Sequence, residues 1–239
     1  MTSSAPRILA ANRAWVESSK ARDPRHFERM AAEHRPHSLF IGCSDARVPA
    51  NVITQTAGGE LFVHRNIANQ ISATDPNVAA VIEYAVHVLG VGDVIVCGHY
   101  GCGGVRAAMA GPMHGFTPHV DSWLANVRTV GRLHDAELHA LPDAERYERL
   151  VELNVVEQVY NVARTPAIQA AWAAGARPRI HGWVYSLREG LLRDLDVTLD
   201  GTAGAQGDAR AAAAVAAIER ARSGGARQPA GDARGAVAV

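Results

Sequence analysis

Two cysteines and a histidine in this chain are spaced so that they could bind one metal ion. Cys43 begins the stretch Cys43-Ser-Asp-Ala-Arg47, and His99 and Cys102 lie in the later stretch Gly98-His-Tyr-Gly-Cys-Gly-Gly104. Thiolates and a neutral imidazole suit a borderline-soft ion, zinc above all. Three such ligands leave a fourth position open, which is typical of catalytic zinc sites. The residues therefore predict a catalytic zinc centre.

Each of these stretches follows a short apolar run, residues 38–41 in the first case and 93–97 in the second. Both runs are rich in β-branched or large apolar residues and predict short buried strands. In an open α/β sheet, ligands bind at the carboxyl ends of neighbouring strands. We therefore expect the two stretches to meet at that edge of a sheet.

The glycines around Cys102 allow its loop to fold back on one ion without side-chain clashes. Residues 103–105 are expected to begin a helix, whose N-terminal amides favour a thiolate at Cys102. Cys97 lies inside the second apolar run and is expected to be a packing residue outside the site. A dinucleotide-binding loop is a weaker interpretation, because Arg106 stands where its third glycine belongs.

Asp45 and Arg47 lie two residues apart in an extended segment, so their side chains project to the same side. They can form a carboxylate–guanidinium pair with two hydrogen bonds. Without that pair, Asp45 could occupy the open metal position as a fourth protein ligand. With it, the position stays free for water, and Asp45 could accept a hydrogen bond from bound hydroxide. We expect this pair to control access to the metal.

The rest of the chain predicts an α/β fold: a mostly parallel sheet with an added edge strand, flanked by helices and preceded by a helical arm. Strands are expected over residues 38–41, 60–65, 93–97, 179–187 and 191–199, and helices over residues 7–20, 24–34, 49–55, 76–89, 117–130, 142–160 and 165–175. Residues 1–200 would form one domain. Residues 201–239, mostly Ala, Gly and Arg, are expected to be a mobile tail.

Composition excludes several other classes of protein. The chain has 239 residues, 48% of them hydrophobic, and equal numbers of basic and acidic residues, 24 each. That charge balance gives no reason to expect nucleic acid or an anionic membrane as a partner. No apolar run approaches the ~20 residues of a membrane span. Three cysteines without a Cys-x-x-Cys pair argue against a disulfide framework, so a cytoplasmic location is expected.

Five motifs in this chain together resemble the β-class carbonic anhydrases, over roughly residues 5–200. They are Cys43-Ser-Asp-Ala-Arg-Val-Pro49, His64-Arg-Asn-Ile-Ala-Asn69, Gly98-His-Tyr-Gly-Cys-Gly-Gly104, Asn154-Val-Val-Glu-Gln-Val-Tyr-Asn161 and His181-Gly-Trp-Val-Tyr185. The resemblance implies a lyase with one zinc ion per chain, bound by Cys43, His99 and Cys102. Asp45 would be the exchangeable fourth ligand and Arg47 its partner.

The reaction that the resemblance implies is the reversible hydration of carbon dioxide to bicarbonate and a proton, by attack of zinc-bound hydroxide. Zinc lowers the pKa of its water toward ~7, a value established on carbonic anhydrase itself. Two thiolate ligands donate more charge than imidazoles, so activity is expected to rise toward alkaline pH. His64 is a candidate for moving the proton, although a packed strand histidine is the simpler interpretation.

Some members of this family bind bicarbonate in a regulatory pocket made by a Trp, an Arg and a Tyr. Arg65 and Tyr185 stand at two of these positions, but Phe40 stands at the tryptophan position and lacks the indole N–H donor. Weak inhibition by bicarbonate is therefore expected. The resemblance also implies a homodimer or homotetramer, with the N-terminal helices reaching over the partner subunit.

Two other functions fit the same residues. A zinc hydrolase acting on carbonyl sulfide or carbon disulfide would turn over carbon dioxide poorly despite full zinc. A structural zinc domain or bicarbonate sensor would keep Asp45 on the metal at every pH, which the presence of Arg47 argues against.

Overall fold

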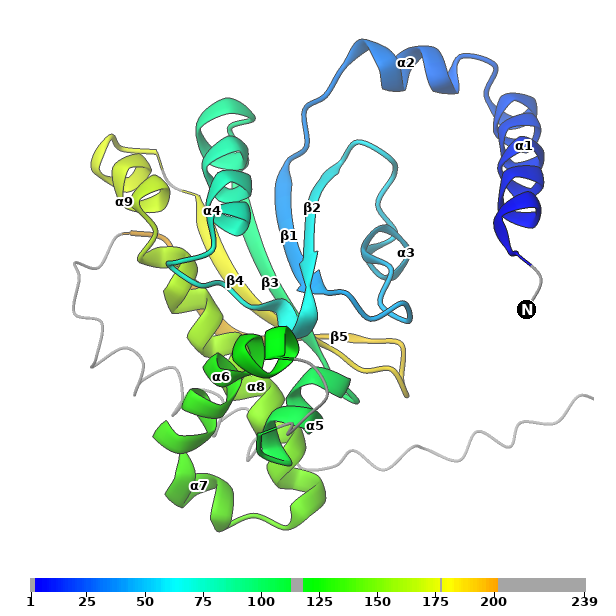
Figure 1. The fold of residues 1–239 in the computed structure, drawn as a ribbon. Helices are drawn as coiled ribbons and strands as arrows, with labels where there is room; N and C mark the ends of the chain where they lie inside the picture. Colours follow the sequence, from blue (N-terminus) through cyan, green and yellow to red (C-terminus); the bar gives the residue numbers. More distant parts are fainter. Residues whose placement is uncertain (1–2, 113–117, 177, 202–239) are drawn as a thin grey trace, which may run out of the picture.

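We describe a computed structural model, which places residues 3–112, 118–176 and 178–201. Five strands form one sheet in the order β2-β1-β3-β4-β5 (Figure 1). Their bounds are β1 Ser38–Cys43, β2 Leu61–Asn66, β3 Asp93–His99, β4 Arg179–Tyr185 and β5 Leu192–Leu199. The first four are parallel, and β5 pairs antiparallel with β4. The predicted sheet and its antiparallel edge strand are confirmed.

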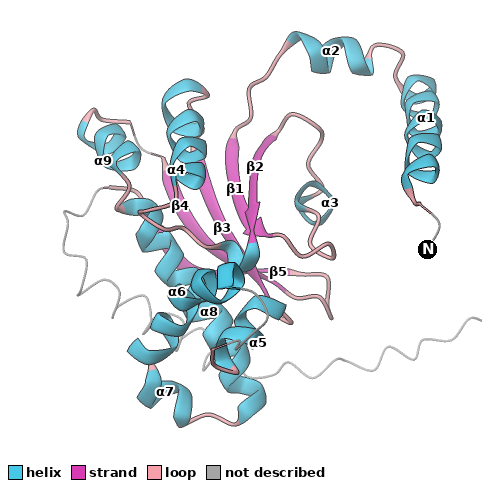
Figure 2. Ribbon diagram, viewed as in Figure 1, coloured by secondary structure: helices cyan, strands magenta, loops and turns pink. Residues whose placement is uncertain are grey.

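Helices connect the parallel strands, as Figure 2 shows by colour. The α-helices are α1 Ala5–Arg22, α2 His26–Ala32, α3 Ala50–Thr54, α4 Pro76–Glu83, α5 Gly103–Met109, α6 Pro118–Leu133, α7 Asp135–His139, α8 Asp143–Ala163 and α9 Pro166–Ala173. A 3-10 turn, Ile67–Asn69, follows β2, and a π-helical turn, Tyr84–Val88, continues α4. None of the described helices is long and apolar enough to cross a membrane.

The main core lies on the face of the sheet that α4, α5, α6, α8 and α9 cover. Val94, Val96 and Ile180 of the sheet are buried there against helix residues such as Val155 and Leu124. Strand β1 is buried along its whole length, so Cys43 at its end is fixed by a rigid element. The segment with the predicted ligand Cys43 therefore follows directly from a buried strand.

A smaller apolar cluster lies on the opposite face of the sheet. Phe40, Ile95 and Cys97 are buried there with Ala50 of α3, and Tyr185 packs against them at the margin. This cluster contains Cys97, as expected for a packing residue. Burial raises the pKa of the Cys97 thiol to about 12, so it stays protonated at neutral pH.

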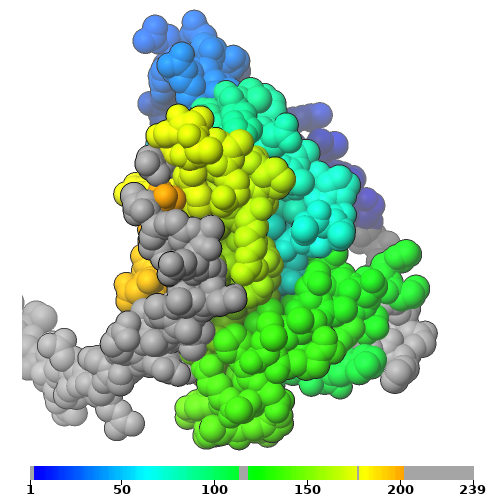
Figure 3. Space-filling view, turned by 90° about the vertical axis from the view of Figure 1, so that its left-hand side faces the viewer, coloured from blue at the N-terminus to red at the C-terminus, as the bar shows by residue number. Residues whose placement is uncertain are grey.

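The N-terminal helices form an arm that stands away from the sheet. Figure 1 shows α1 and α2 at a distance from the strands, and in Figure 3 the blue helix α2 projects beyond the top of the molecule. The two helices contact each other through Trp15 and Phe27, whose ring centroids are 5.2 Å apart. Ile8 and Leu9 of α1 remain 58% and 62% exposed. The expected helical arm is present and carries apolar side chains in solvent.

Several predicted element bounds need correction. The second helix begins at His26, not at Pro24, because Asp23 ends α1 and its carboxylate accepts hydrogen bonds from the Arg25 amide and the Arg29 side chain. That helix ends at Ala32. The short helix α7 was not predicted. Strand β3 continues through His99, two residues past its predicted end. The predicted tail lies outside the described residues, except for Gly201.

Candidate metal centre

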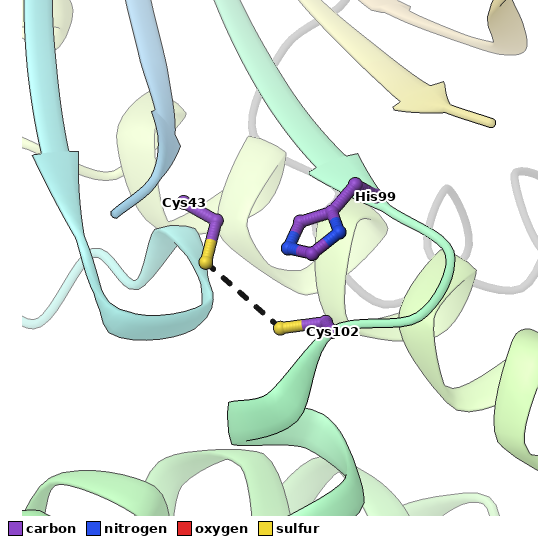
Figure 4. A group of neighbouring side chains, drawn as sticks. All are labelled: Cys43, His99 and Cys102. Carbon is purple, nitrogen blue, oxygen red and sulfur yellow. Dashed lines mark hydrogen bonds between the residues drawn. The ribbon is translucent and has the colours of Figure 1, made fainter. Parts of the chain in front are cut away.

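Three side chains from separate elements meet at the carboxyl ends of β1 and β3. Cys43 is the last residue of β1, His99 the last of β3, and Cys102 directly precedes α5 (Figure 4). Their ligand atoms all lie within 4.8 Å of one another. The two sulfur atoms are 3.9 Å apart. All three side chains are buried. The chain thus brings together the three predicted ligands.

The imidazole of His99 is oriented for metal binding by its own loop. Its Nδ1 atom lies 3.1 Å from the main-chain oxygen of Tyr100. A carbonyl oxygen only accepts, so Nδ1 carries the proton and Nε2 holds a free lone pair. Nε2 is buried and has no hydrogen-bond partner among the described residues. A buried nitrogen left without a partner beside two thiols fits a metal ligand.

The two thiols affect each other's ionisation. The hydrogen bond from the Cys102 thiol lowers the pKa of Cys43, and the ionised Cys43 raises the pKa of Cys102 in turn. Without a cation, the pair therefore ionises once and resists a second ionisation. A divalent ion between the sulfurs would offset this repulsion and stabilise both thiolates. The donor set fits zinc.

Asp45 and Arg47 form the predicted pair beside these ligands. Arg47 donates to the Asp45 carboxylate from Nε at 2.9 Å and from Nη2 at 2.6 Å, and its amide donates at 2.9 Å. This guanidinium holds the pKa of Asp45 well below its usual range, so the carboxylate is ionised. Arg47 also donates to the main-chain oxygen of Gly101 at 3.3 Å. The Asp45 Oδ2 atom lies 3.7 Å from Nε2 of His99.

Arg65 supports the loop that carries Asp45. Its Nε donates to the main-chain oxygen of Cys43 at 2.8 Å, and its Nη2 donates to that of Asp45 at 2.5 Å. Phe40 is fully buried in the smaller cluster, and Tyr185 packs at the margin of the same cluster. The structure therefore places Phe40 and Tyr185 in the same apolar cluster and gives Arg65 two main-chain partners near the predicted metal ligands.

His64 fits the simpler interpretation, a packed strand histidine. It is buried in β2, and its Nε2 lies 3.2 Å from the side-chain nitrogen of Asn66, which donates to it. Burial lowers the pKa of its imidazole. A neutral ring with a fixed partner gives no support for proton transfer by His64.

The sequence alone did not indicate Tyr147, which lies in α8 and reaches the metal-binding loop. Its hydroxyl donates to the main-chain oxygen of Cys102 at 2.7 Å. Together with Arg47, Gly101 and Arg188, it also lines a cavity of about 590 Å³ beside the Asp45–Arg47 pair. No local motif contains Tyr147, and only the tertiary fold shows its contact with Cys102.

Sequence comparison places the chain among known proteins. The family profile described as carbonic anhydrase matches residues 38–192. A carbonic anhydrase of Emericella nidulans is 47% identical over 196 residues, covering 82% of this chain and 85% of that protein. A carbonic anhydrase of Pseudomonas aeruginosa is 39% identical over 173 residues, covering 71% of this chain and 78% of that protein.

Solved structures agree with the sequence comparison. The Coccomyxa β-carbonic anhydrase in complex with acetazolamide superposes with a TM-score of 0.78 at 37% identity, covering 84% of this chain and 90% of that one. One of two tetrameric β-carbonic anhydrases from Sordaria macrospora superposes with a TM-score of 0.76 at 36% identity, covering 81% and 97%. The chain therefore belongs to the β-carbonic anhydrase family, zinc enzymes that hydrate carbon dioxide to bicarbonate and a proton.

Proposed function

We propose that Cys43, His99 and Cys102 bind the zinc ion of this enzyme and that Asp45 and Arg47 control its fourth position. The observation that carries the proposal is the buried Nε2 of His99, which has no hydrogen-bond partner among the described residues and faces two thiols 3.9 Å apart. When bound, zinc would supply an acidic water; its pKa is ~7 with three imidazole ligands and is expected to be higher with two thiolates. Carbon dioxide hydration measured together with zinc content tests the proposal.

The Asp45–Arg47 pair works as a gate with two positions. Held by Arg47, the Asp45 carboxylate leaves the fourth position open and is available as a hydrogen-bond acceptor for water there. Released from Arg47, it needs to move only a short way to reach the metal, because Oδ2 is 3.7 Å from His99 Nε2. The hydrogen bond from Arg47 to Gly101 supports the guanidinium in the open state. Arg47 thus keeps the enzyme active.

We expect bicarbonate to bind only weakly at a regulatory site made by Phe40, Arg65 and Tyr185. Phe40 has no donor, and Arg65 already gives two of its donors to main-chain oxygens. Phe40→Trp adds an indole N–H, so we expect bicarbonate to inhibit about tenfold more strongly, as one new hydrogen bond to an anion of about 1.5 kcal/mol allows.

The measurement is the bicarbonate inhibition constant of the hydration reaction, with Phe27→Trp in α2 as the matched control. The Phe40 ring is tightly enclosed, because a Cβ on Gly42 would lie 2.6 Å from it, so the unfolding temperature of the variant is recorded as well. A folded Phe40→Trp enzyme with unchanged bicarbonate sensitivity would rule out this site.

The chain is expected to assemble as a homodimer or homotetramer. The relatives from Sordaria macrospora are described as tetrameric. Ile8, Leu9 and Trp15 of the arm are 58%, 62% and 47% exposed, so the arm offers large apolar side chains that an interface between subunits would bury. Light scattering coupled to gel filtration at micromolar concentration should give a mass of two or four chains. A single-chain mass at that concentration would contradict the assembly.

A further inference from the structure

Helix α8 passes closely under the strands that end at the metal centre. A Cβ atom on Gly98 of β3 would lie only 2.5 Å from Val155 of α8, and one on Gly182 of β4 would lie 3.2 Å from Val159. Glycine at these two positions therefore allows the helix to approach the sheet closely. As a result, polar side chains of α8 reach the loop that carries His99 and Cys102 and the turn Ile67–Asn69, which lies beside Cys43.

The first contact is with Cys102. Tyr147 donates its hydroxyl proton to the main-chain oxygen of Cys102 at 2.7 Å. The guanidinium of Arg106, in α5, lies over the Tyr147 ring at 4.8 Å from its centre. This cation–π contact holds one face of the Tyr147 ring, while the hydrogen bond to Cys102 holds its hydroxyl. Tyr147 thus holds the main chain of one ligand against α8.

The second contact is with the residue that orients His99. Tyr100 provides the carbonyl oxygen for the Nδ1 proton of His99, and its own hydroxyl donates to Glu152 Oε1 of α8 at 2.8 Å. Glu152 is buried and accepts a hydrogen bond from Arg149 at 3.2 Å. Arg149 also pairs with Glu137 of α7. A buried charged network therefore fixes the position of Tyr100 and, through it, the imidazole.

The third contact is with Ala68, in the turn beside Cys43. Ala68 lies two residues after Asn66, which pairs with Cys43 across the sheet, and Ala68 and Cys43 are buried in the same cluster. The oxygen of Ala68 accepts hydrogen bonds from Asn154 of α8 at 3.1 Å and from Gln70 at 2.8 Å. Ala68 has a φ of +61°, a left-handed conformation that costs an alanine free energy. The hydrogen bonds from Asn154 and Gln70 hold Ala68 in this conformation beside Cys43.

We propose that Tyr147, Glu152 and Asn154 of α8 are positioning residues of the metal centre: Tyr147 and Glu152 hold the loop from His99 to Cys102, and Asn154 holds the turn beside Cys43. The inference rests on the proposed zinc ligands and adds the element that aligns them. Residues that orient metal ligands typically change metal affinity by about 10- to 100-fold when they are replaced. We therefore expect α8 to govern how fast the enzyme loses its metal.

The test uses the zinc-loaded enzyme and Tyr147→Phe, which removes one hydroxyl and keeps the ring. Zinc release to excess chelator should become about tenfold faster, and the thiolate-to-metal absorption band of the cobalt-substituted protein should shift. The unfolding temperature of the metal-free protein should stay near that of the wild type. Tyr84→Phe is the matched control, because the hydroxyl of Tyr84 has no hydrogen-bond partner within the described part of the chain.

Glu152→Gln provides a second variant, since it weakens the hydrogen bond to Tyr100, with Glu157→Gln on the same helix as its control. Glu157 is partly exposed, and among the residues that the structure places it forms an ion pair only with Arg164, at 3.8 Å. Zinc release and cobalt spectra identical to the wild type in both Tyr147→Phe and Glu152→Gln would overturn the inference. Zinc retained by Cys43→Ser would instead overturn the ligand assignment, so the two failures are distinguishable.

Discussion

Cys43→Ser is expected to lose bound zinc and to reduce carbon dioxide hydration by about a thousandfold or more. Serine offers a poorly acidic hydroxyl in place of a thiolate, and two ligands hold zinc far less tightly than three. Loss of the metal removes several kcal/mol of stabilisation of the reaction, and each 1.36 kcal/mol is about tenfold in rate. Zinc content by atomic emission and stopped-flow hydration rates check the result.

Cys97→Ser is the matched control for this variant. Cys97 is also fully buried and is adjacent in the sheet to Gly42, next to Cys43, but it faces the smaller apolar cluster. We expect Cys97→Ser to keep one zinc ion per chain and near-normal hydration. A Cys43→Ser enzyme that still holds zinc as tightly as Cys97→Ser would show that Cys43 is not a ligand.

Arg47→Ala is expected to lower hydration near neutral pH by about tenfold to a hundredfold. Arg47 is 59% exposed and solvent screens its pair with Asp45, so losing the two charge-assisted hydrogen bonds is expected to have only this moderate effect. Released Asp45 stays ionised, because its usual pKa of about 4 is far below neutral pH. It then competes with water for the fourth metal position.

The pH dependence of Arg47→Ala follows from this competition. Raising the pH favours ionised water over the Asp45 carboxylate, so activity should recover in alkaline solution and the apparent pKa of the rate profile should rise. Asp45→Ala provides the background for a double-mutant cycle. With no carboxylate to release, Arg47→Ala should cost little in that background. An equal loss in both backgrounds would mean that Arg47 does not act through Asp45.

The meeting of the three proposed ligands was predictable from local rules. Cys43 and His99 end strands whose apolar composition is visible in the sequence, and parallel strands bring their carboxyl ends together. The Asp45–Arg47 pair follows from a spacing of two residues in an extended segment. Both inferences need only short windows of sequence, and the structure confirms the geometry of each.

The support from α8 was not predictable in the same way. Tyr147 and Asn154 lie in a regular helix whose pattern gives no sign of their partners, Cys102 and Ala68. These contacts join residues that are 45 and 86 positions apart in the chain. The left-handed φ of Ala68 is also hidden, because alanine rarely adopts it and only the tertiary contacts stabilise it.

The predicted bounds of helices were wrong where a side chain forms contacts that the local sequence pattern does not show. Asp23-Pro24 has the composition of a helix start, but the Asp23 carboxylate binds Arg29 and its amide donates to Ser19 at the end of α1. The pattern over residues 76–89 correctly predicts one continuous helical segment. It does not reveal the π-helical turn over Tyr84–Val88, which changes the side of the helix on which the last residues lie.

Stopped-flow hydration of carbon dioxide across roughly pH 6.5 to 9, a range that brackets the ~7 of zinc-bound water, tests the central claim most directly. The zinc content of the same sample is measured first. With one zinc ion per chain, the rate should climb as pH rises, because ionisation of the bound water produces the attacking group. One zinc ion per chain without turnover at any pH, or a rate that falls as pH rises, would contradict the account.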